Sequence, residues 1–532
     1  MKTFINKIIA LTVFLSALLP ASAYGFMVDG LAYDIVSTGD LTCRVVPADQ
    51  KYEGDIIIPE KVTYRGREFR VVDFTGFQNC EGLTSIVIPP TCSWLTDCFA
   101  GCVNLKSVSL PKTIKGLQGT FFNCRSLKAI TLPDSIVCLG MRENGSFQGA
   151  FEGCSSLVEI VIPHSVTEID ERCFIDCRTL VSVNIPPKVE RLPYRCFENC
   201  TALKRVTFEC DTCTIGRYCF SGCTSLETIE LPQTLKGIGE AAFRACSSLK
   251  KISLPLSVTD IGNLCFAECS ELNDVNLGSI TQIPSGAFRN CTNLTSLIIP
   301  SSVYWLSLYT CSDLSNDIIK TFENVPLNTL TIESCADGWL PVGYYKYEKD
   351  IHSAYRYEYK WHQISRSQQQ DLVYADFVAK LEHLDINRLL ADGLRLDVPN
   401  LKTLSFNMAV EDVDKSIYQT LIGLDKLEYI QVKSLEPEPF DKNRFSAKQY
   451  MDLQVIVPDS SIDAYKQDAS WKNFWNIMTE SEFRAGIREV AADSEKVEVA
   501  RYDMQGRPVG ENYTGVMIIK YSDGTTKKVS RL

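Results

Sequence analysis

A fixed spacing of phenylalanine and cysteine runs through the middle of the chain and limits what it can fold into. Ten phenylalanines recur every 22 or 23 residues, apart from one insertion, and each is followed three residues later by a cysteine. The phenylalanines are Phe77, Phe99, Phe121, Phe151, Phe174, Phe197, Phe220, Phe243, Phe266 and Phe288, and the cysteines are Cys80, Cys102, Cys124, Cys154, Cys177, Cys200, Cys223, Cys246, Cys269 and Cys291. A period of this length is typical of structures in which each repeat contacts only its neighbours.

The remainder of each repeat reads F-x-x-C-x-x-L-x-x-I-x-L-P-x-x-V-x-x-I. The alternating apolar positions, such as Val183 and Ile185, predict a short strand, and the proline that follows ends it because proline lacks an N–H. One repeat cannot bury its own apolar residues, whereas stacked repeats share a core. The pattern predicts a leucine-rich repeat solenoid, mainly β, with a parallel sheet of about ten regular rungs that is roughly 50 Å long at about 4.8 Å a rung.

Three interpretations compete for the cysteines: metal ligands, disulfides or buried free thiols. Neighbouring CFxxC units would bring several thiols together, which could suit zinc. The position just before each phenylalanine argues against zinc, because Gly, Ala and Thr alternate with Cys there: Gly76, Cys98, Thr120, Ala150, Cys173, Cys196, Cys219, Ala242, Cys265 and Ala287. Parallel side chains on adjacent rungs also hold their Cβ atoms too far apart for a disulfide.

Buried free thiols are therefore the favoured interpretation, with each weak S–H facing a backbone carbonyl. Secreted proteins tend to pair their cysteines. A disulfide that involves Cys43, Cys210 or Cys213 thus stays open as an alternative.

The N-terminus resembles a secretory signal. Lys2 and Lys7 precede the apolar run 8–19, and Ala21-Ser22-Ala23 follows as a small-residue cleavage site. No later stretch reaches the roughly 18 apolar residues of a membrane span. The net charge of −11 and the dispersed basic residues do not fit nucleic-acid binding. We expect a secreted or cell-surface protein that does not span the membrane.

The units F-x-x-C-x-S-L-x-x-I-x-L-P resemble the BspA-like leucine-rich repeat family of bacterial cell-surface proteins. Residues 26–70 are similar to the N-terminal β cap of that family, and residues 457–474 to its array ending, where Trp471, Phe474 and Trp475 are expected to close the core. The resemblance implies an adhesin or protein-binding protein, with a host matrix or cell-surface protein as partner. Residues 502–509 and 515–525 resemble a shortened C-terminal β-rich sorting domain.

These patterns predict five segments. They are a signal peptide at 1–23, an N-terminal β cap at 24–76, regular repeats at 77–313, irregular repeats with an aromatic hairpin insertion (339–361) and a terminal cap at 314–480, and a β tail at 481–532.

Outward strand positions form the first candidate binding surface. Small hydroxylated residues at one end of the array give way to mixed charge further along, as at Arg205, Thr228, Glu230 and Lys251. Such a face suits broad, wet contact with a protein. The alternative is a merely solvated sheet face.

The second candidate is an aromatic hairpin. Tyr345, Tyr347, Tyr355, Tyr357, Tyr359 and Trp361 alternate with charged residues, so two strands would place them on one face. Rigid aromatic rings provide contact area for a glycan or a protein. The alternative is that they pack onto irregular rungs.

No motif of catalysis or metal binding is found. The four histidines, His164, His352, His362 and His383, are scattered, and G-x-S-x-G, H-E-x-x-H and phosphate-loop patterns are missing. We expect no enzyme and no cofactor. The hypotheses are an adhesin-like protein-binding solenoid, a carbohydrate-binding accessory protein that uses the hairpin, and a purely structural surface protein.

Overall fold

The computed structural model describes most of the chain after residue 24. The described residues are 25–140, 148–312, 318–334, 339–340, 342–349, 357–363, 377–387, 389–390, 396–407, 421–437, 440–441, 443–485, 498–503, 509–510, 515–521 and 526–531. They fall into two compact units, one comprising residues 1–383 and 388–398 and the other residues 384–387 and 399–532. The expected signal peptide lies outside the described residues.

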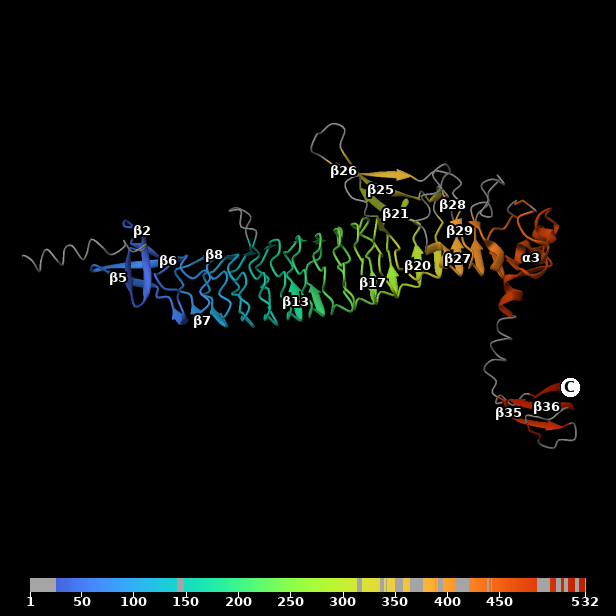
Figure 1. The fold of residues 1–532 in the computed structure, drawn as a ribbon, viewed down its shortest axis with the longest axis horizontal. Helices are drawn as coiled ribbons and strands as arrows, with labels where there is room; N and C mark the ends of the chain where they lie inside the picture. Colours follow the sequence, from blue (N-terminus) through green and yellow to red (C-terminus); the bar gives the residue numbers. More distant parts are fainter. Residues whose placement is uncertain are drawn as a thin grey trace, which may run out of the picture. The chain divides into compact units, whose positions relative to one another are not determined.

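A five-stranded sheet covers the start of the array (Figure 1, blue). Its strands, in spatial order, are β1 (Phe26–Val28), β2 (Leu31–Ser37), β3 (Thr42–Val45), β6 (Arg67–Phe74) and β5 (Lys61–Tyr64). Phe26 stacks on Tyr64 with ring centroids 4.2 Å apart, and Phe74 contacts both Phe77 and Phe99. This sheet therefore supplies the apolar surface that the first rung would otherwise expose to water.

Stacked rungs follow, as the repeat predicts (Figure 1). One series of parallel strands lies at the alternating apolar positions: β4 (Gly54–Ile57), β7 (Leu83–Val87), β9 (Ser107–Ser109), β13 (Ser182–Ile185), β15 (Arg205–Phe208), β17 (Lys251–Ser253), β18 (Asp274–Asn276), β20 (Ser296–Ile299) and β23 (Thr329–Ile332). Residues pair in register from rung to rung, for example Val183 with Val206. The solenoid class is confirmed.

The first series differs from the expected sheet in one respect, because strand pairing is interrupted. Around Ala129 and Glu159 only isolated bridges remain, and residues 227–231 form no assigned strand. The side-chain amide of Asn184 offers a reason at one rung. It accepts a hydrogen bond from Ile162 N at 2.9 Å and donates one to Ile162 O at 2.9 Å, so a side chain takes over backbone bonds of the ladder.

A second series of short parallel strands lies after the corner that follows the first strand of each rung. It comprises β8 (Trp94–Thr96), β10 (Gly116–Gln118), β11 (Cys138–Leu139), β12 (Glu168–Ile169), β14 (Arg191–Leu192), β16 (Thr214–Ile215), β19 (Gln282–Ile283) and β21 (Trp305–Ser312). Ile238 and Ile261 continue it as bridges. The sequence pattern marked these positions only as apolar, without predicting strands.

The phenylalanines form one continuous stack inside the array. From Phe99 to Phe322 successive rings are stacked, with centroids 5.2–6.0 Å apart. The tightest pair is Phe174 and Phe197, at 5.2 Å and an interplanar angle of 1°. Phe322 extends the stack beyond the regular repeats, and Val325, also fully buried, occupies the place of the cysteine there.

Each ladder cysteine, the one three residues after a phenylalanine, is buried and unpaired. From Cys102 onward its thiol donates a hydrogen bond to the phenylalanine carbonyl of the preceding rung, with Sγ···O distances of 2.9–3.3 Å. That carbonyl also accepts a backbone N–H from its own rung, as Phe197 O does from Cys200 N. The prediction of buried thiols that face carbonyls is confirmed for this set.

In each rung at least one residue close to the phenylalanine takes a left-handed backbone. The position two residues after it has positive φ in Asn79, Gly101, Asn123, Gly153, Asp176, Asn199, Gly222, Ala245, Glu268, Asn290 and Asn324. Asn and Gly dominate because they adopt this conformation at little cost.

Further strands of the first unit follow the regular rungs: β22 (Ile319–Lys320), β24 (Trp339–Leu340), β25 (Val342–Lys349), β26 (Tyr357–Gln363), β28 (Leu389–Leu390) and β29 (Leu396–Asp397). β25 runs parallel to β21 and antiparallel to β26.

The second unit has its own parallel strands and short helices. The strands are β27 (His383–Ile386), β30 (Thr403–Phe406), β31 (Leu421–Ile422), β32 (Tyr429–Val432), β33 (Gln454–Val457) and β34 (Asn476–Thr479), and the helices are α3 (Ala447–Asp452), α4 (Ile462–Gln467), η4 (Leu424–Lys426), η5 (Asp459–Ser461) and η6 (Trp471–Asn473). β30, β32, β33 and β34 pair in register as parallel strands. A separate antiparallel sheet contains β35 (Glu498–Asp503), β36 (Gly515–Tyr521) and β37 (Thr526–Arg531).

The predicted closing cluster of the second unit is partly wrong. Trp471 and Phe474 are buried with Phe440 and Tyr465, which is the expected plug. Trp475 is 74% exposed instead. Adjacent residues of extended backbone point to opposite sides, so only one of Phe474 and Trp475 can face the core.

Phe197→Ala tests the stack. Removing this ring leaves a cavity between two stacked neighbours, so we expect the free energy of unfolding to fall by about 3–5 kcal/mol. Urea denaturation followed by circular dichroism measures it. Thr207→Ala, in the exposed part of the same rung, should change stability by less than about 0.5 kcal/mol. An equal loss in both variants would contradict the stack as the source of stability.

Alkaline pH tests the thiols. Burial raises the pKa of Cys246 and Cys291 from about 9 to about 12. Between these values unfolded thiols ionise while folded ones stay protonated, so the free energy of unfolding falls as pH rises from about 9 to about 12, and the stabilisation is fully present below about pH 9. We expect a loss of about 1.4 kcal/mol per thiol per pH unit.

Urea denaturation from about pH 8 to about pH 10 measures this slope, and Cys246→Ala is the control because it removes one contributor. Between about pH 8 and about pH 10 the variant should lose about 1.4 kcal/mol less stability in total than the wild type, because the unfolded thiol is only half ionised near pH 9. Identical slopes in the two proteins would show that the buried thiol does not titrate as expected.

Candidate interaction surfaces

The outward positions of the first strand series form an exposed surface over a buried core. Arg205, Thr228, Glu230 and Lys251 are all exposed, whereas the strand positions that alternate with them, such as Ile229 and Ile252, are buried. Thr228 and Glu230 lie in the rung without an assigned strand, yet they keep the same alternation. We call the outward positions of the first strand series, taken over all rungs, the outward face. The alternation follows from the strand period of two.

Charges on and beside the outward face pair between neighbouring rungs. Lys251 Nζ lies 2.7 Å from Asp274 Oδ2, and Lys250 Nζ lies 2.8 Å from Glu227 Oε2. The side chains are more than half exposed, so each pair contributes at most about 1 kcal/mol to stability. Among the described residues no ion pair is recorded for Arg205 or Glu230. These two charges are the ones that a partner could engage without breaking an internal pair.

Apolar side chains are also exposed on the outward face. Ile57, Val161 and Ile298 are 73%, 75% and 53% exposed, and Val87 pairs in register with Ile57. Ile57 and Val87 are neighbours, whereas Val161 and Ile298 lie on distant rungs, so these side chains do not form one apolar patch. The face is therefore mixed in character, with hydroxyl, charged and aliphatic groups interspersed.

Ion pairs that sequence analysis did not predict line the turns beside the phenylalanine stack. Arg172 and Glu152 make two hydrogen bonds, and Arg244 with Glu268 and Arg289 with Glu323 repeat the arrangement. The Arg195 guanidinium lies 5.0 Å and 5.4 Å from the ring centroids of Tyr194 and Tyr218. These partly buried contacts join adjacent rungs and serve the scaffold. The spacing of 20–34 residues between partners is visible only once the repeat register is known.

The hairpin has the backbone expected of it. β25 and β26 pair antiparallel, with Tyr345 opposite Trp361 and Tyr347 opposite Tyr359. Opposite residues of an antiparallel pair share one side of the ladder, so these four positions lie on the same side, with Tyr357 opposite Lys349. Tyr355 lies outside the described residues.

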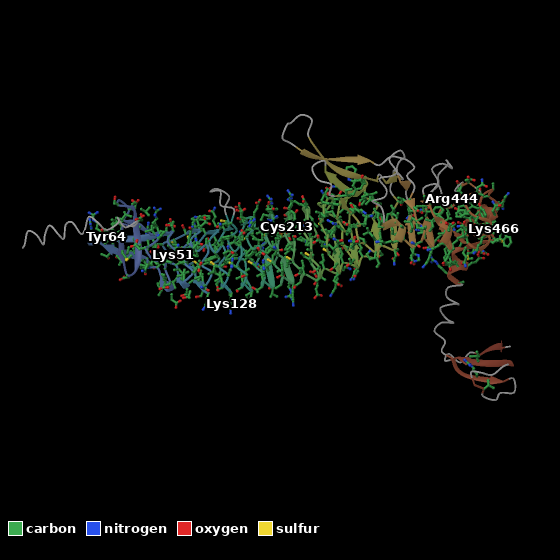
Figure 2. The ribbon with its side chains drawn as sticks, viewed as in Figure 1. Lys51, Tyr64, Lys128, Cys213, Arg444 and Lys466 are labelled. Carbon is green, nitrogen blue, oxygen red and sulfur yellow. The ribbon has the colours of Figure 1, made fainter. Side chains whose placement is uncertain are left out.

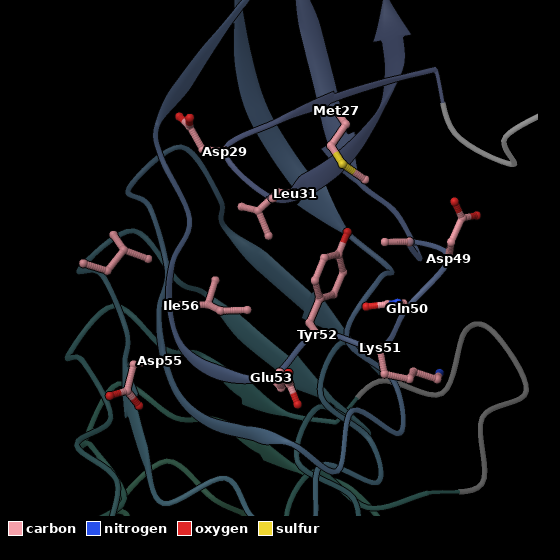
Figure 3. Close-up of a pocket in the computed structure, with 13 residues that line it drawn as sticks. Met27, Asp29, Leu31, Asp49, Gln50, Lys51, Tyr52, Glu53, Asp55 and Ile56 are labelled. Atoms are coloured by element: carbon pink, nitrogen blue, oxygen red, sulfur yellow. The ribbon is translucent and has the colours of Figure 1, made fainter.

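The N-terminal cap holds a cleft that sequence analysis missed. About 730 Å³ in volume, it is bounded by the turn after β1, the loop 48–53 and strand β4. Figure 3 shows its side chains arranged around Tyr52, whose hydroxyl donates to Val46 O at 2.7 Å and accepts from Ala32 N at 3.0 Å.

Asp29, Glu53 and Asp55 give the rim of the cleft acidic character. Asp55 accepts hydrogen bonds from Thr84 and Ser85, which lower its pKa. The residues of the cleft come from two stretches of the cap, 27–31 and 48–57, and no motif signals them.

The thiols do not form a metal site in the part of the chain that the structure describes. No group of three or more His, Cys, Asp or Glu side chains there is arranged to hold a metal ion. Burial raises the pKa of Cys102, Cys154 and Cys246 to about 12, so these sulfurs remain protonated at neutral pH. Within the described residues no helix has both the length and the apolar character needed to cross a membrane.

Comparison with known proteins identifies the repeat. A model described as "BspA type Leucine rich repeat region" matches in six copies over residues 147–215 and 195–318. No curated protein matches the chain.

Several solved structures share similarity with the chain. A leucine-rich repeat protein from Bacteroides ovatus is 21% identical, over 79% of this chain and 99% of that one, with a TM-score of 0.49. A leucine-rich cell surface protein from Faecalibacterium prausnitzii is 21% identical over 60% and 97%, with a TM-score of 0.33. The T. pallidum leucine-rich repeat protein is 26% identical, over 38% of this chain and 90% of that one, with a TM-score of 0.32.

Replacing the outward charges should leave the fold intact. In the triple variant Arg205→Ala/Glu230→Ala/Lys251→Ala only exposed groups are lost, so we expect stability to change by less than about 1 kcal/mol. Glu152→Ala, which removes a buried partner of Arg172, should cost about 1–3 kcal/mol. Thermal unfolding of both variants checks this. A comparable loss in the triple variant would mean that the outward charges serve the scaffold.

Proposed function

We propose that this chain, whose residues 147–318 form a BspA-type leucine-rich repeat region, is a non-enzymatic binding protein, secreted or held at the cell surface. It engages a protein partner, such as a host matrix or cell-surface protein, through the outward face of its repeat array. The observation that carries the proposal is the alternation of exposed outward residues with buried or half-buried ones at rung after rung.

The character of the outward face favours a protein partner over a small molecule. Its hydroxyl, charged and aliphatic groups are spread over successive rungs, whereas the cleft described above lies in the N-terminal cap. Small-molecule sites are concave and mostly apolar, whereas protein interfaces are broad and about as polar as the rest of the surface. The stacked core holds the outward residues in fixed positions, so little order has to be gained on binding.

The state of the cysteines supports a function without catalysis. A nucleophilic cysteine requires a thiolate and a nearby base. The ladder thiols are buried, their pKa values are raised by burial, and their protons are bound to phenylalanine carbonyls. Abundant cysteine therefore reflects packing in this array.

Carbohydrate binding through the hairpin is the second candidate. The register that sets Tyr345 opposite Trp361 and Tyr347 opposite Tyr359 favours it, because neighbouring aromatic positions on one side of a ladder suit stacking against sugar rings. This function would make the protein an accessory of glycan capture.

Binding of the full chain to a panel of extracellular-matrix proteins and polysaccharides tests both functions side by side. We expect saturable binding to at least one matrix protein. The triple variant Arg205→Ala/Glu230→Ala/Lys251→Ala should weaken it roughly tenfold, about 1.4 kcal/mol. The variant Tyr345→Ala/Tyr357→Ala/Trp361→Ala should bind like the wild type.

The reverse pattern would overturn the first proposal. Selective glycan binding that is lost in the aromatic variant, with unchanged thermal stability, assigns the function to the hairpin. Lys128→Ala, a change beside the outward face on a distant rung, is the matched control for non-specific loss of charge.

A further inference from the structure

The corner of each rung follows a common pattern that one rung breaks. After the first strand a proline begins the corner, and the N–H of the fourth corner residue returns to the carbonyl of the first. The pairs are Pro89–Cys92, Pro111–Ile114, Pro133–Ile136, Pro163–Val166, Pro186–Val189, Pro232–Leu235, Pro255–Val258 and Pro300–Val303. Leu277 and Ile280 make the same bond without proline. The proline pins its own φ, which restrains the corner before the second strand begins.

The rung of Phe197 has no proline at its corner. By the register of β13 and β15, Glu209 stands where the neighbouring rung has Pro186. Pro186 and Val189 are buried with two exposed residues between them, and Cys210 and Cys213 repeat this arrangement one residue later, with Asp211 and Thr212 exposed. Two cysteines thus take the buried places of the proline and the valine.

These two thiols contact each other. The side chains of Cys210 and Cys213 share a hydrogen bond. The ladder thiols differ, because each donates its proton to a phenylalanine carbonyl on the preceding rung, as Cys200 does to Phe174 O at 3.2 Å and Cys223 to Phe197 O at 3.3 Å. The two sulfurs of Cys210 and Cys213 therefore face each other, whereas the ladder thiols of the regular rungs face carbonyl oxygens.

We propose that Cys210 and Cys213 are a disulfide-forming pair, and that the structure shows them in the dithiol form. The oxidant is a disulfide donor, such as an oxidised dithiol protein or oxidised glutathione. The Cys210 sulfur attacks the donor disulfide and releases one donor thiol. The Cys213 sulfur then attacks Cys210 of the mixed disulfide and releases the second, so that two electrons and two protons pass to the donor.

The order of attack follows from the surroundings of the two sulfurs. Cys210 is 4% exposed and Cys213 is fully buried, so Cys210 is the sulfur nearer to solvent. The hydrogen bond from Cys213 lowers the pKa of Cys210, whereas the same bond and burial raise the pKa of Cys213. The thiolate is the nucleophile in this exchange, so the reaction begins at Cys210.

Closing the bond would restrain the corner that lacks proline. A link between the first and fourth residues fixes the loop between β15 and β16, as the proline and its backbone hydrogen bond do elsewhere. Glu209, beside Cys210, lies 3.0 Å from His164 Nε2 and 3.5 Å from the Asn184 amide, so it contacts two preceding rungs. Figure 2 shows Cys213 within the array.

The chain offers a clean assay, because trypsin cleaves after Arg205 and Arg217. The resulting peptide, residues 206–217, contains Cys210 and Cys213 and no other cysteine. The purified full chain is equilibrated with a glutathione redox buffer, unfolded in an alkylating reagent, digested and analysed by mass spectrometry. We expect peptide 206–217 to carry no alkyl group unless the chain is first reduced. Peptide 196–204, with Cys196 and Cys200, is the matched control and should carry two.

Thermal unfolding gives a second readout. Reduction should lower the melting temperature of the oxidised chain by about 2–4 °C. Cys210→Ser should show the lower value without reductant and no further response to it, whereas Cys92→Ala, at a corner that keeps its proline, should respond like the wild type. Full alkylation of both peptides in the unreduced chain, or a wild-type melting temperature unaffected by reductant, would overturn the proposal.

Discussion

Stacking of one phenylalanine per rung is the interaction on which the rest of the array depends. The rings repeat at 5.2–6.0 Å, close to the separation of neighbouring β-strands, so ring stacking and backbone pairing can be satisfied by the same rise. The ladder cysteine completes the arrangement. It is small enough to lie beside the rings, and its S–H occupies the second acceptor site of a carbonyl that would otherwise make a single bond. Alanine would leave that site empty, and serine would bring a more polar group into the core.

The period was enough to predict the solenoid, because a shared interior requires the same side chain at the same place in every rung. Other features could not be predicted from the sequence, and the reasons are physical. Strands of two residues, such as β14 and β16, are too short to show an alternation. Phe322 continues the stack, but valine replaces the cysteine three residues after it. A search for the phenylalanine–cysteine spacing therefore stops one rung early. Trp475 was assigned to the core because an aromatic triplet does not reveal which ring faces inward.

The candidate surfaces also include some features that could be predicted from the sequence and others that could not. Exposure at Arg205 and Lys251 follows from strand alternation and could be read from sequence. The antiparallel register of β25 and β26 could also be anticipated, since each strand alternates aromatic with charged residues. The turn-side ion pairs and the cap cleft could not, because their members come from separate rungs or loops and meet only through the left-handed turns and the close packing around Tyr52. Local sequence propensity does not indicate contacts between residues of different rungs or loops.

The parallel register also has a mechanical consequence. From the rung of Phe99 to that of Phe288, each rung is joined to the next by backbone hydrogen bonds, a hydrogen bond from a thiol and a pair of stacked rings, so these rungs are coupled in series. A load applied between the two ends of the array would fall on one interface after another, and a rung at the end would peel away before those behind it were disturbed. Each release would free a loop of about 23 residues, the length of one repeat. An array built in this way yields in small increments under tension and can close again one rung at a time.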